Sequence, residues 1–125
     1  MMKRVLLAED EPNIVESLTF ILERSGFEVG VTTTGRQALE QAQTETPDIL
    51  ILDVMLPEMD GYEVLRRLRA DARTKSLPIL MLTAKGQRED RETALSCGAD
   101  MFVTKPFVNS DLIAAVKKLA GSDTA

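Results

Sequence analysis

The sequence predicts a single α/β domain whose core is a parallel sheet of five strands. Its 125 residues, 44% of them apolar, suffice for one domain with one hydrophobic core. Short apolar runs alternate five times with segments of helical periodicity, a pattern typical of parallel strands joined by crossover helices. The most apolar run, Ile49–Leu52, is followed by turn residues and stops on Asp53, as a buried strand does.

Each strand and helix of the N-terminal half has its own local pattern. A short apolar run predicts the first strand, and alternation of apolar with polar or small residues predicts a half-buried second strand. A proline suits the start of the first helix, a Thr-Gly pair opens the second, and a glycine and a proline end them. The expected elements are strand Val5–Ala8, helix Pro12–Ser25, strand Phe27–Val31 and helix Thr34–Thr46.

The C-terminal half predicts three further strands, each followed by a helix. The fourth helix is weakly apolar and highly charged, and three arginines of the third are expected to point outward. Those arginines form either a solvated face or a patch that docks a partner. The expected elements are strand Ile49–Leu52, helix Gly61–Ala72 with Arg66, Arg67 and Arg69 outside, strand Ile79–Leu82, helix Arg88–Ser96, strand Met101–Thr104 and a last helix capped by Asn109 or Ser110.

The apolar content of the strands also predicts their order in the sheet. The first, third and fourth are continuously apolar, as expected of strands that are buried on both faces. The second alternates and the fifth is short and mixed, which indicates edge strands. The order 2-1-3-4-5, that of a doubly wound, flavodoxin-like sheet, satisfies both conditions.

Composition excludes several classes of function. The absence of histidine excludes His-based triads and His-ligated metals, and the single cysteine, Cys97, excludes an internal disulfide. A net charge of −5 argues against direct binding of nucleic acid by this domain. With no signal peptide and no apolar run that could span a membrane, we expect a cytoplasmic protein.

Polar and charged residues follow four different strands. Glu9 and Asp10 follow the first strand, Asp53 the third, Thr83 the fourth and Lys105 the fifth. Because parallel strands all end at the same edge, these side chains should meet there, close to the switch point between strands one and three. For Asp53 alone, a simple strand-end cap is an equally good reading. The coincidence of four strand ends favours a functional site.

The chemistry expected at this edge follows from its charge. Clustered carboxylates repel one another unless a cation or raised pKa values relieve the repulsion. An all-oxygen ligand set favours Mg²⁺, or Mn²⁺, and Mg²⁺ commonly takes a phosphate as a further ligand. With a lysine and a hydroxyl nearby, the set is suited to phosphoryl transfer, and a carboxylate can serve as the nucleophile.

These residues stand in motifs that resemble the receiver domain of two-component response regulators. The motifs are Glu9-Asp10, DVMLPEMDG at 53–61, Thr83-Ala84 and Lys105-Pro106-Phe107, and the resemblance covers nearly the whole chain. It implies that Asp53 is the phosphoacceptor, with Mg²⁺ as the cofactor. Further implied roles are direct metal ligation by Asp10, ligation through water by Glu9, ligation by the backbone carbonyl of Met55, binding of phosphoryl oxygens by Thr83 and Lys105, and switching by Thr83 and Phe102.

The resemblance also implies partners and a domain boundary. The phosphoryl donor would be a sensor histidine kinase or a histidine phosphotransfer protein. The fourth helix, fifth strand and last helix would form the face that engages an output domain or partner protein, or a second copy of the chain. Residues 1–121 would form the receiver domain, and residues 122–125 a flexible tail or the start of a linker. Such a domain is a signalling module, catalysing only its own phosphorylation and slow dephosphorylation.

Several positions depart from the family's pattern, and two other functions remain open. Glu9 replaces a common aspartate, Phe102 a frequent tyrosine, and neither Met55 nor Lys85 can orient a water, which predicts slow self-hydrolysis. Arg91, Asp100 and Asp111 fit a known dimer network, but Met101 and Ala115 stand where it has charged residues. The alternatives are a Mg²⁺-dependent phosphatase, which typically has a second aspartate at the position of Met55, and a receiver-like module that is never phosphorylated.

Overall fold

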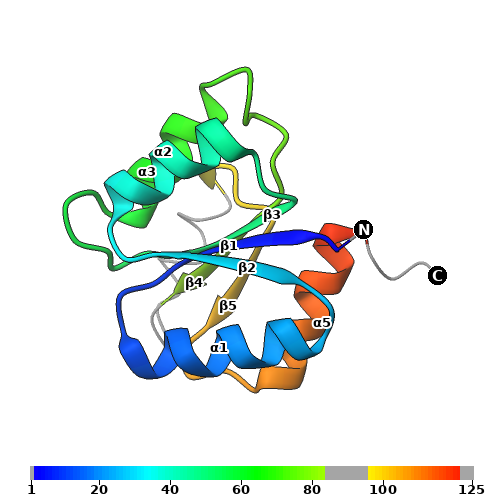
Figure 1. Ribbon diagram of the computed structural model, residues 1–125. Coiled ribbons are helices and arrows are strands. Elements are labelled where there is room, and N and C mark those ends of the chain that lie inside the picture. Colours follow the sequence, from blue (N-terminus) through cyan, green and yellow to red (C-terminus); the bar gives the residue numbers. More distant parts are fainter. Residues whose placement is uncertain (1, 84–95, 122–125) are drawn as a thin grey trace.

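A computed structural model of the protein describes residues 2–83 and 96–121. The strands are β1 (Arg4–Ala8), β2 (Glu28–Thr32), β3 (Ile49–Asp53), β4 (Ile79–Thr83) and β5 (Met101–Thr104). The helices are α1 (Pro12–Arg24), α2 (Gly35–Glu45), α3 (Gly61–Arg69) and α5 (Asn109–Ala120) (Figure 1). Apart from Ser96, the expected helix Arg88–Ser96 lies outside the described residues. No helix within the described ranges is long and apolar enough to cross a membrane.

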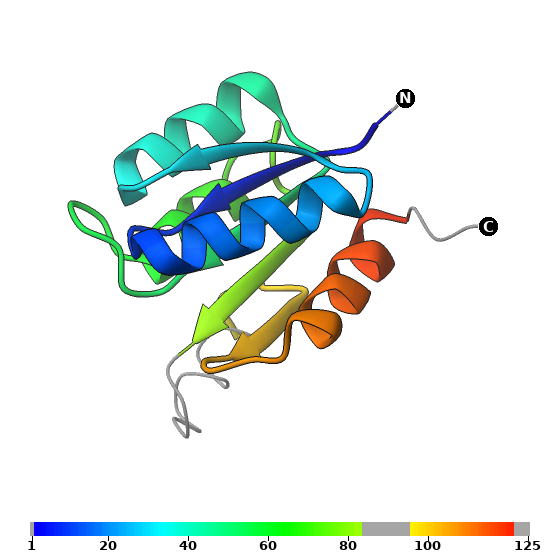
Figure 2. The same ribbon diagram turned by 60° about the horizontal axis from the view of Figure 1, so that its bottom comes forward.

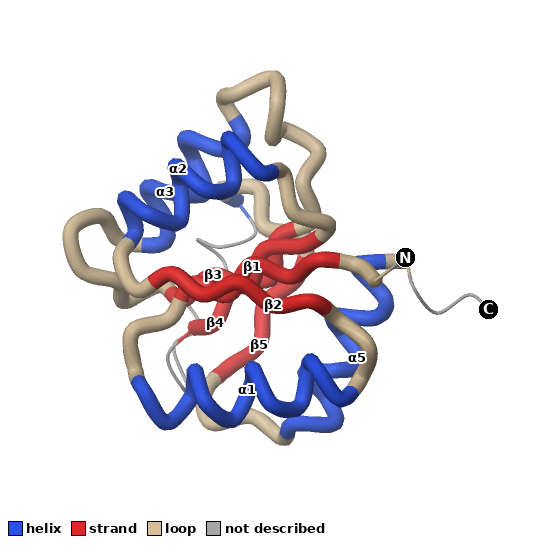
Figure 3. The backbone as a smooth tube through the Cα atoms, viewed as in Figure 1, coloured by secondary structure: helices blue, strands red, loops and turns tan. Residues whose placement is uncertain are grey.

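The strands form one parallel sheet in the order β2-β1-β3-β4-β5, which confirms the predicted order and its flavodoxin-like class. Helices α1 and α5 cover one face of the sheet, and α2 and α3 cover the other (Figures 1 and 3). The carboxyl ends of the strands therefore share one edge. The amino end of the chain and the last turn of α5 lie on the opposite side of the molecule (Figure 2).

The sheet divides the core into two layers, because successive residues of a strand point to opposite faces. Along β3, Leu50 and Leu52 pack beneath α2 and α3, whereas Ile49 and Ile51 pack against α1 and α5. Every residue of β3 and β4 is buried. Asp53 is the last residue of β3 and thus ends a strand that is shielded from water along its whole length.

The second strand departs from the predicted alternation at Val31. The side chain of Val31 is 38% exposed, whereas Phe27 is buried but precedes the strand instead of belonging to it. Because β2 is an edge strand, only β1 shields it within the sheet. The apolar pattern identified the strand but not the depth of burial of each residue.

Helix α3 ends at Arg69, earlier than the predicted Ala72. The Thr74 hydroxyl donates a hydrogen bond of 2.6 Å to the Leu68 carbonyl, and the Asp71 N–H donates to the same oxygen. Both contacts use the Leu68 carbonyl in place of a helical hydrogen bond from four residues later, so the helix ends there. The contact from Thr74 joins a side chain to a backbone carbonyl six residues earlier, and no periodic pattern in the sequence indicates it.

Helix α5 begins differently from the prediction, which placed Asn109 or Ser110 at its cap. The N-cap is Val108, and no side chain caps the helix. The N–H groups of Asp111 and Leu112 donate to the Val108 carbonyl at 3.0 and 3.1 Å. Asn109 is therefore already the first residue of the helix, and the prediction of its cap was wrong.

Arg69 was expected to point outward, and this expectation was wrong. Its side chain is only 19% exposed, and its guanidinium pairs with Asp100 at 2.9 Å. It also donates to four backbone carbonyls, those of Thr74, Lys75, Leu77 and Gly98. Arg69 thereby joins the end of α3 to the segments that precede β4 and β5.

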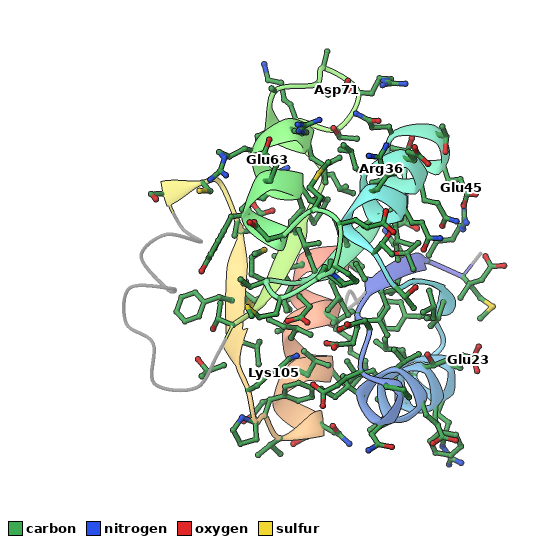
Figure 4. The ribbon with its side chains drawn as sticks, turned by 90° about the vertical axis from the view of Figure 1, so that its left-hand side faces the viewer. Glu23, Arg36, Glu45, Glu63, Asp71 and Lys105 are labelled. Carbon is green, nitrogen blue, oxygen red and sulfur yellow. The ribbon has the colours of Figure 1, made fainter. Side chains whose placement is uncertain are left out.

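The other two arginines of α3 do lie on the surface. Arg66 and Arg67 are about half exposed and pair with Glu63, at 2.9 and 2.8 Å. Figure 4 shows Glu63 on the outer side of α3, away from the sheet. Both are half exposed and share one acid on the same helix, Glu63, so they fit the expected solvated face.

Candidate functional site

The shared carboxyl edge of the sheet brings together the residues that follow four strands. Glu9 follows β1, while Asp53 and Thr83 are the last residues of β3 and β4. Lys105 follows β5, where the chain turns toward α5 (Figure 4). Three of these polar side chains are almost fully buried: Glu9 is 0%, Asp53 3% and Thr83 1% exposed. The juxtaposition predicted from the parallel topology is therefore present.

Lys105 is the positive centre of this edge. Its Nζ lies 3.1 Å from Glu9 Oε1 and 3.2 Å from Asp53 Oδ1. Glu11, which is exposed, approaches the same Nζ at 3.8 Å. The bond between Lys105 and Pro106 is cis. Among the described residues, one ammonium group thus faces several carboxylates, which leaves an excess of negative charge among these side chains.

Burial and like charge set the protonation behaviour of the site. Burial raises the pKa of the Glu9 carboxyl, and the negative charge of Asp53 raises it further; the Glu11 N–H and Lys105 oppose this shift only in part. Burial alone would lower the pKa of Lys105, but the charges of Asp53 and Glu9 outweigh it and raise that pKa. Lys105 therefore stays charged at neutral pH, whereas burial disfavours the ionised form of Glu9.

The acidic side chains can converge on one cation. Oxygen atoms of Glu9, Asp10 and Asp53 all lie within 4.8 Å of one another. Asp10 is exposed to solvent, and buried Glu9 Oε1 has an ion pair but no hydrogen bond to any group that the structure describes. A divalent cation would satisfy this oxygen and offset the repulsion, and the all-oxygen donor set fits Mg²⁺. The arrangement therefore fits the metal ligands expected from the sequence.

Thr83 brings a hydroxyl to the edge that none of residues 2–83 and 96–121 uses. Its Oγ1 is buried and has no hydrogen-bond partner within those ranges. An unpaired hydroxyl at this depth is costly unless a ligand completes it. Phe102 lies opposite Met81 in the β4–β5 register and packs with it in the layer beneath α2 and α3. Since Thr83 is two residues beyond Met81, it points to the same face of the sheet as Phe102.

Met55 is the middle residue of a tight turn directly after β3. The Leu56 N–H donates to the Val54 carbonyl at 3.1 Å, and the Met55 side chain is 74% exposed. The loop closes where the Gly61 N–H donates to the same Val54 carbonyl at 2.8 Å. A Cβ on Gly61 would overlap the carbonyl oxygen of Asp53. Glycine at this position therefore lets α3 begin against the backbone of the candidate nucleophile.

Glu11 was given no role in the site by the sequence, and Gly61 was predicted only as the last residue of the 53–61 motif. Glu11 is the last of the three consecutive acids that begin at Glu9, and its backbone N–H donates to Glu9 Oε2 at 3.1 Å. The run of three acids was visible, but a linear pattern does not tell which acids turn inward. Gly61 was visible as a turn residue, whereas its close contact with Asp53 depends on the folded loop.

The electrostatics of Glu9 lead to a pH-dependent prediction. Glu9→Gln should raise the free energy of unfolding of the metal-free protein at pH 7 by on the order of 1 kcal/mol, because the amide avoids burying a charge. A carboxyl with a raised pKa in the folded state stabilises it below the ordinary value of 4.5 and loses that contribution as pH rises through the folded-state pKa. The advantage of the variant should therefore shrink toward pH 4.5.

Urea unfolding in EDTA at a series of pH values measures this difference. Exposed Glu16→Gln on α1 is the matched control and should leave the free energy of unfolding nearly unchanged. A Glu9→Gln variant less stable than the wild type at pH 7 would show that the Lys105 pair outweighs the cost of burial.

Comparisons with known proteins agree with this geometry. A family model described as "Response regulator receiver domain" matches residues 5–117. The alkaline phosphatase synthesis transcriptional regulatory protein PhoP of Bacillus subtilis is 45% identical over 119 residues, which are 95% of this chain and 49% of PhoP. The chain thus spans about half the length of the curated relatives it matches.

Solved structures show the same fold. The chemotaxis response regulator CheY4 of Vibrio cholerae superimposes with a TM-score of 0.88 at 32% identity, covering 95% of this chain and 99% of CheY4. The receiver domain of the sensor histidine kinase PA1611 of Pseudomonas aeruginosa has a TM-score of 0.84 at 31% identity, covering 97% of this chain and 99% of that domain. That structure holds a magnesium ion in its active site cleft.

Proposed function

The chain belongs to the family of response regulator receiver domains, and from that premise we propose that Asp53 accepts the phosphoryl group through which this two-component signalling domain is switched. The observation that carries the proposal is the position of Asp53. Its carboxylate is buried at the end of β3, 3.2 Å from Lys105 Nζ, and shares an acidic cluster with Glu9 and Asp10.

In the proposed reaction, an oxygen of Asp53 attacks the phosphorus of a phosphohistidine. The new O–P bond forms as the P–N bond breaks, and the freed electron pair returns to the imidazole nitrogen, which then takes up a proton. Lys105 neutralises charge on the phosphoryl oxygens, and the unpaired Thr83 hydroxyl donates a hydrogen bond to one of them.

The acidic residues fit a divalent cation, Mg²⁺ in the first place and Mn²⁺ as a second candidate with the same oxygen ligands. Asp10 and Asp53 would bind it directly, Glu9 through water, and Met55 through its backbone carbonyl. When bound, the cation supplies charge neutralisation for the phosphoryl oxygens. The chain's own contribution is to hold its carboxylates in place before any donor arrives.

The proposed response couples Thr83 to Phe102. Movement of Thr83 toward a phosphoryl oxygen would free space for the Phe102 ring, since both side chains lie on the same face of adjacent strands. The output face would comprise β5, α5 and the segment between β4 and β5, most of which lies outside the described residues. The change is a shift between two existing populations. Neither Met55 nor Lys85, which also lies outside those residues, can orient an attacking water, so the phosphoryl group should be long-lived.

Partners follow from the same proposal. A sensor histidine kinase or phosphotransfer protein would supply the phosphoryl group in the cytoplasm, and a C-terminal output domain or a separate protein would receive the signal. We assign residues 1–121 to the receiver domain and residues 122–125 to a tail or linker. With a net charge of −5, the domain itself should not bind nucleic acid.

A homodimer through the output face would draw on the network that the sequence indicated, in which Asp100 already has partners within its own chain. Asp100 already accepts hydrogen bonds from Arg69 at 2.9 Å and from the Ile79 N–H at 2.8 Å, both within the chain. Arg91 lies outside the described residues, and Asp111 lies in the first turn of α5. Both bonds end on Asp100 Oδ2, and the Asp100 side chain is 43% exposed, so Asp100 can still contact a second copy.

Metal removal tests the proposed function. Incubation with acetyl phosphate and Mg²⁺ should add a single phosphoryl group to the chain, and EDTA should slow this labelling by at least about a hundredfold. Intact-mass measurement over time reads the labelling directly. Labelling at an equal rate in EDTA would contradict the role of the acidic cluster, and steady turnover of a small phosphate ester in place of acetyl phosphate would indicate a phosphatase.

A further inference from the structure

The loop between β3 and α3, residues 54–60, is held by the first turn of α2. We propose that this turn positions the loop, and that Gly35 is the positioning residue. The proposal rests on the proposed function in one respect, which is the assignment of the Met55 carbonyl as a metal ligand. The new element is that Gly35, on α2, sets the affinity of the site for its cation by holding the loop from outside.

The loop contains a backbone conformation that requires support. The Met59 N–H donates to the Pro57 carbonyl at 2.8 Å, which closes a three-residue turn around Glu58. The φ angle of Glu58 is +70°, in the left-handed region that is unfavourable for a residue with a side chain. Such a turn persists when neighbouring groups hold it in place.

Helix α2 provides that support from its first two residues. The Gly35 N–H donates at 3.1 Å to the Pro57 carbonyl, the same oxygen that closes the turn. Arg36 Nε lies 3.7 Å from the Glu58 carboxylate. A Cβ on Gly35 would overlap the Met59 carbonyl oxygen, so only glycine permits this approach.

The start of α2 and the far end of the loop are both anchored. Thr34 Oγ1 accepts a hydrogen bond from the Gln37 N–H at 3.1 Å, and Gln37 Oε1 accepts one from the Thr33 N–H at 3.3 Å. This reciprocal arrangement fixes the start of α2. The far end of the loop is fixed at Gly61, which lies against the Asp53 backbone. A displacement forced at Gly35 must therefore be absorbed within the loop, where Met55 lies.

Gly35→Ala tests the proposal, with Gly30→Ala as the matched control. A Cβ at Gly30 on β2 would meet only Leu6 Cδ1, at an ordinary 3.8 Å. We expect Gly35→Ala to weaken Mg²⁺ binding by about tenfold, as loss of a group that orients metal ligands does, and Gly30→Ala to bind as the wild type does. Calorimetric titration measures both, below the unfolding temperatures. Amide chemical shifts of residues 54–60 in EDTA should move in Gly35→Ala alone.

A second measurement uses the unaltered protein. If the α2 turn positions the loop, linkage requires that Mg²⁺ in turn stabilise the hydrogen bond from Gly35 to Pro57. Exchange of the Gly35 amide should slow by about tenfold at saturating Mg²⁺, and this result supports the proposal even if Gly35→Ala fails to fold. Unchanged exchange overturns it, as does a folded Gly35→Ala with wild-type affinity and wild-type loop shifts. A wild type that binds no Mg²⁺ would instead contradict the proposed function, and the loop shifts in EDTA would then decide the positioning role.

Discussion

Asp53→Asn is expected to abolish phosphoryl labelling by acetyl phosphate in the presence of Mg²⁺. The amide has nearly the shape of the carboxylate but lacks the charged oxygen that attacks phosphorus, so the rate should fall by at least about a hundredfold. The fold should survive, because Asp53 ends β3 and its backbone packing is unaffected by the change. Intact-mass analysis and far-UV circular dichroism of the same sample separate loss of reaction from loss of structure.

Asp48→Asn is the matched control for this variant. Asp48 precedes the opposite end of β3, where its Oδ2 accepts a hydrogen bond from the Arg4 N–H at 2.6 Å. The same substitution at this end of the strand should leave labelling at the wild-type rate. Wild-type labelling of Asp53→Asn would reject the assignment of the nucleophile, and loss of labelling in both variants would point to damage of β3 in general.

Arg69→Ala should lower the free energy of unfolding by about 2–4 kcal/mol. The substitution removes the guanidinium that donates to the carbonyls of Thr74, Lys75, Leu77 and Gly98 and pairs with Asp100. Several of these groups are partly buried and would lose their partner without full access to water. Urea unfolding followed by circular dichroism gives the change directly.

Arg67→Ala provides the comparison on the same helix. Its side chain is 55% exposed and pairs with Glu63, so its loss should cost no more than about 0.5 kcal/mol. The free energy of unfolding of Arg69→Lys should lie between those of the two alanine variants, since one ammonium group cannot reach the same set of carbonyls. Equal costs for the two alanine variants would show that Arg69 is an ordinary surface residue after all.

The sheet could be predicted from the sequence because each strand has a local pattern of apolar residues. The run Ile49–Leu52 has no polar residue, and it is buried on both faces. The valines and leucines of the other strands likewise identify central and edge positions. Once the strands were ordered, parallel topology was enough to bring Glu9, Asp53, Thr83 and Lys105 to one edge.

What could not be predicted depends on contacts between distant residues. Nothing in the spacing of Arg66, Arg67 and Arg69 distinguishes the one that turns inward. That difference arises because Gly98 and Asp100, about thirty residues later, come within reach of the end of α3. The link from Gly35 to the loop is of the same kind, since the glycine is visible in the sequence whereas the carbonyl beside it is not.

The last turn of α5 lies on the side of the molecule opposite the acidic edge, which limits how a signal can leave the domain. A five-residue strand spans about 17 Å, so a segment that follows Gly121 starts roughly one full strand length from Asp53. About five fully extended residues are needed to cover that distance. A shorter linker after Gly121 cannot reach the reacting group, so with such a linker any coupling to Asp53 has to pass through the packed elements of the domain.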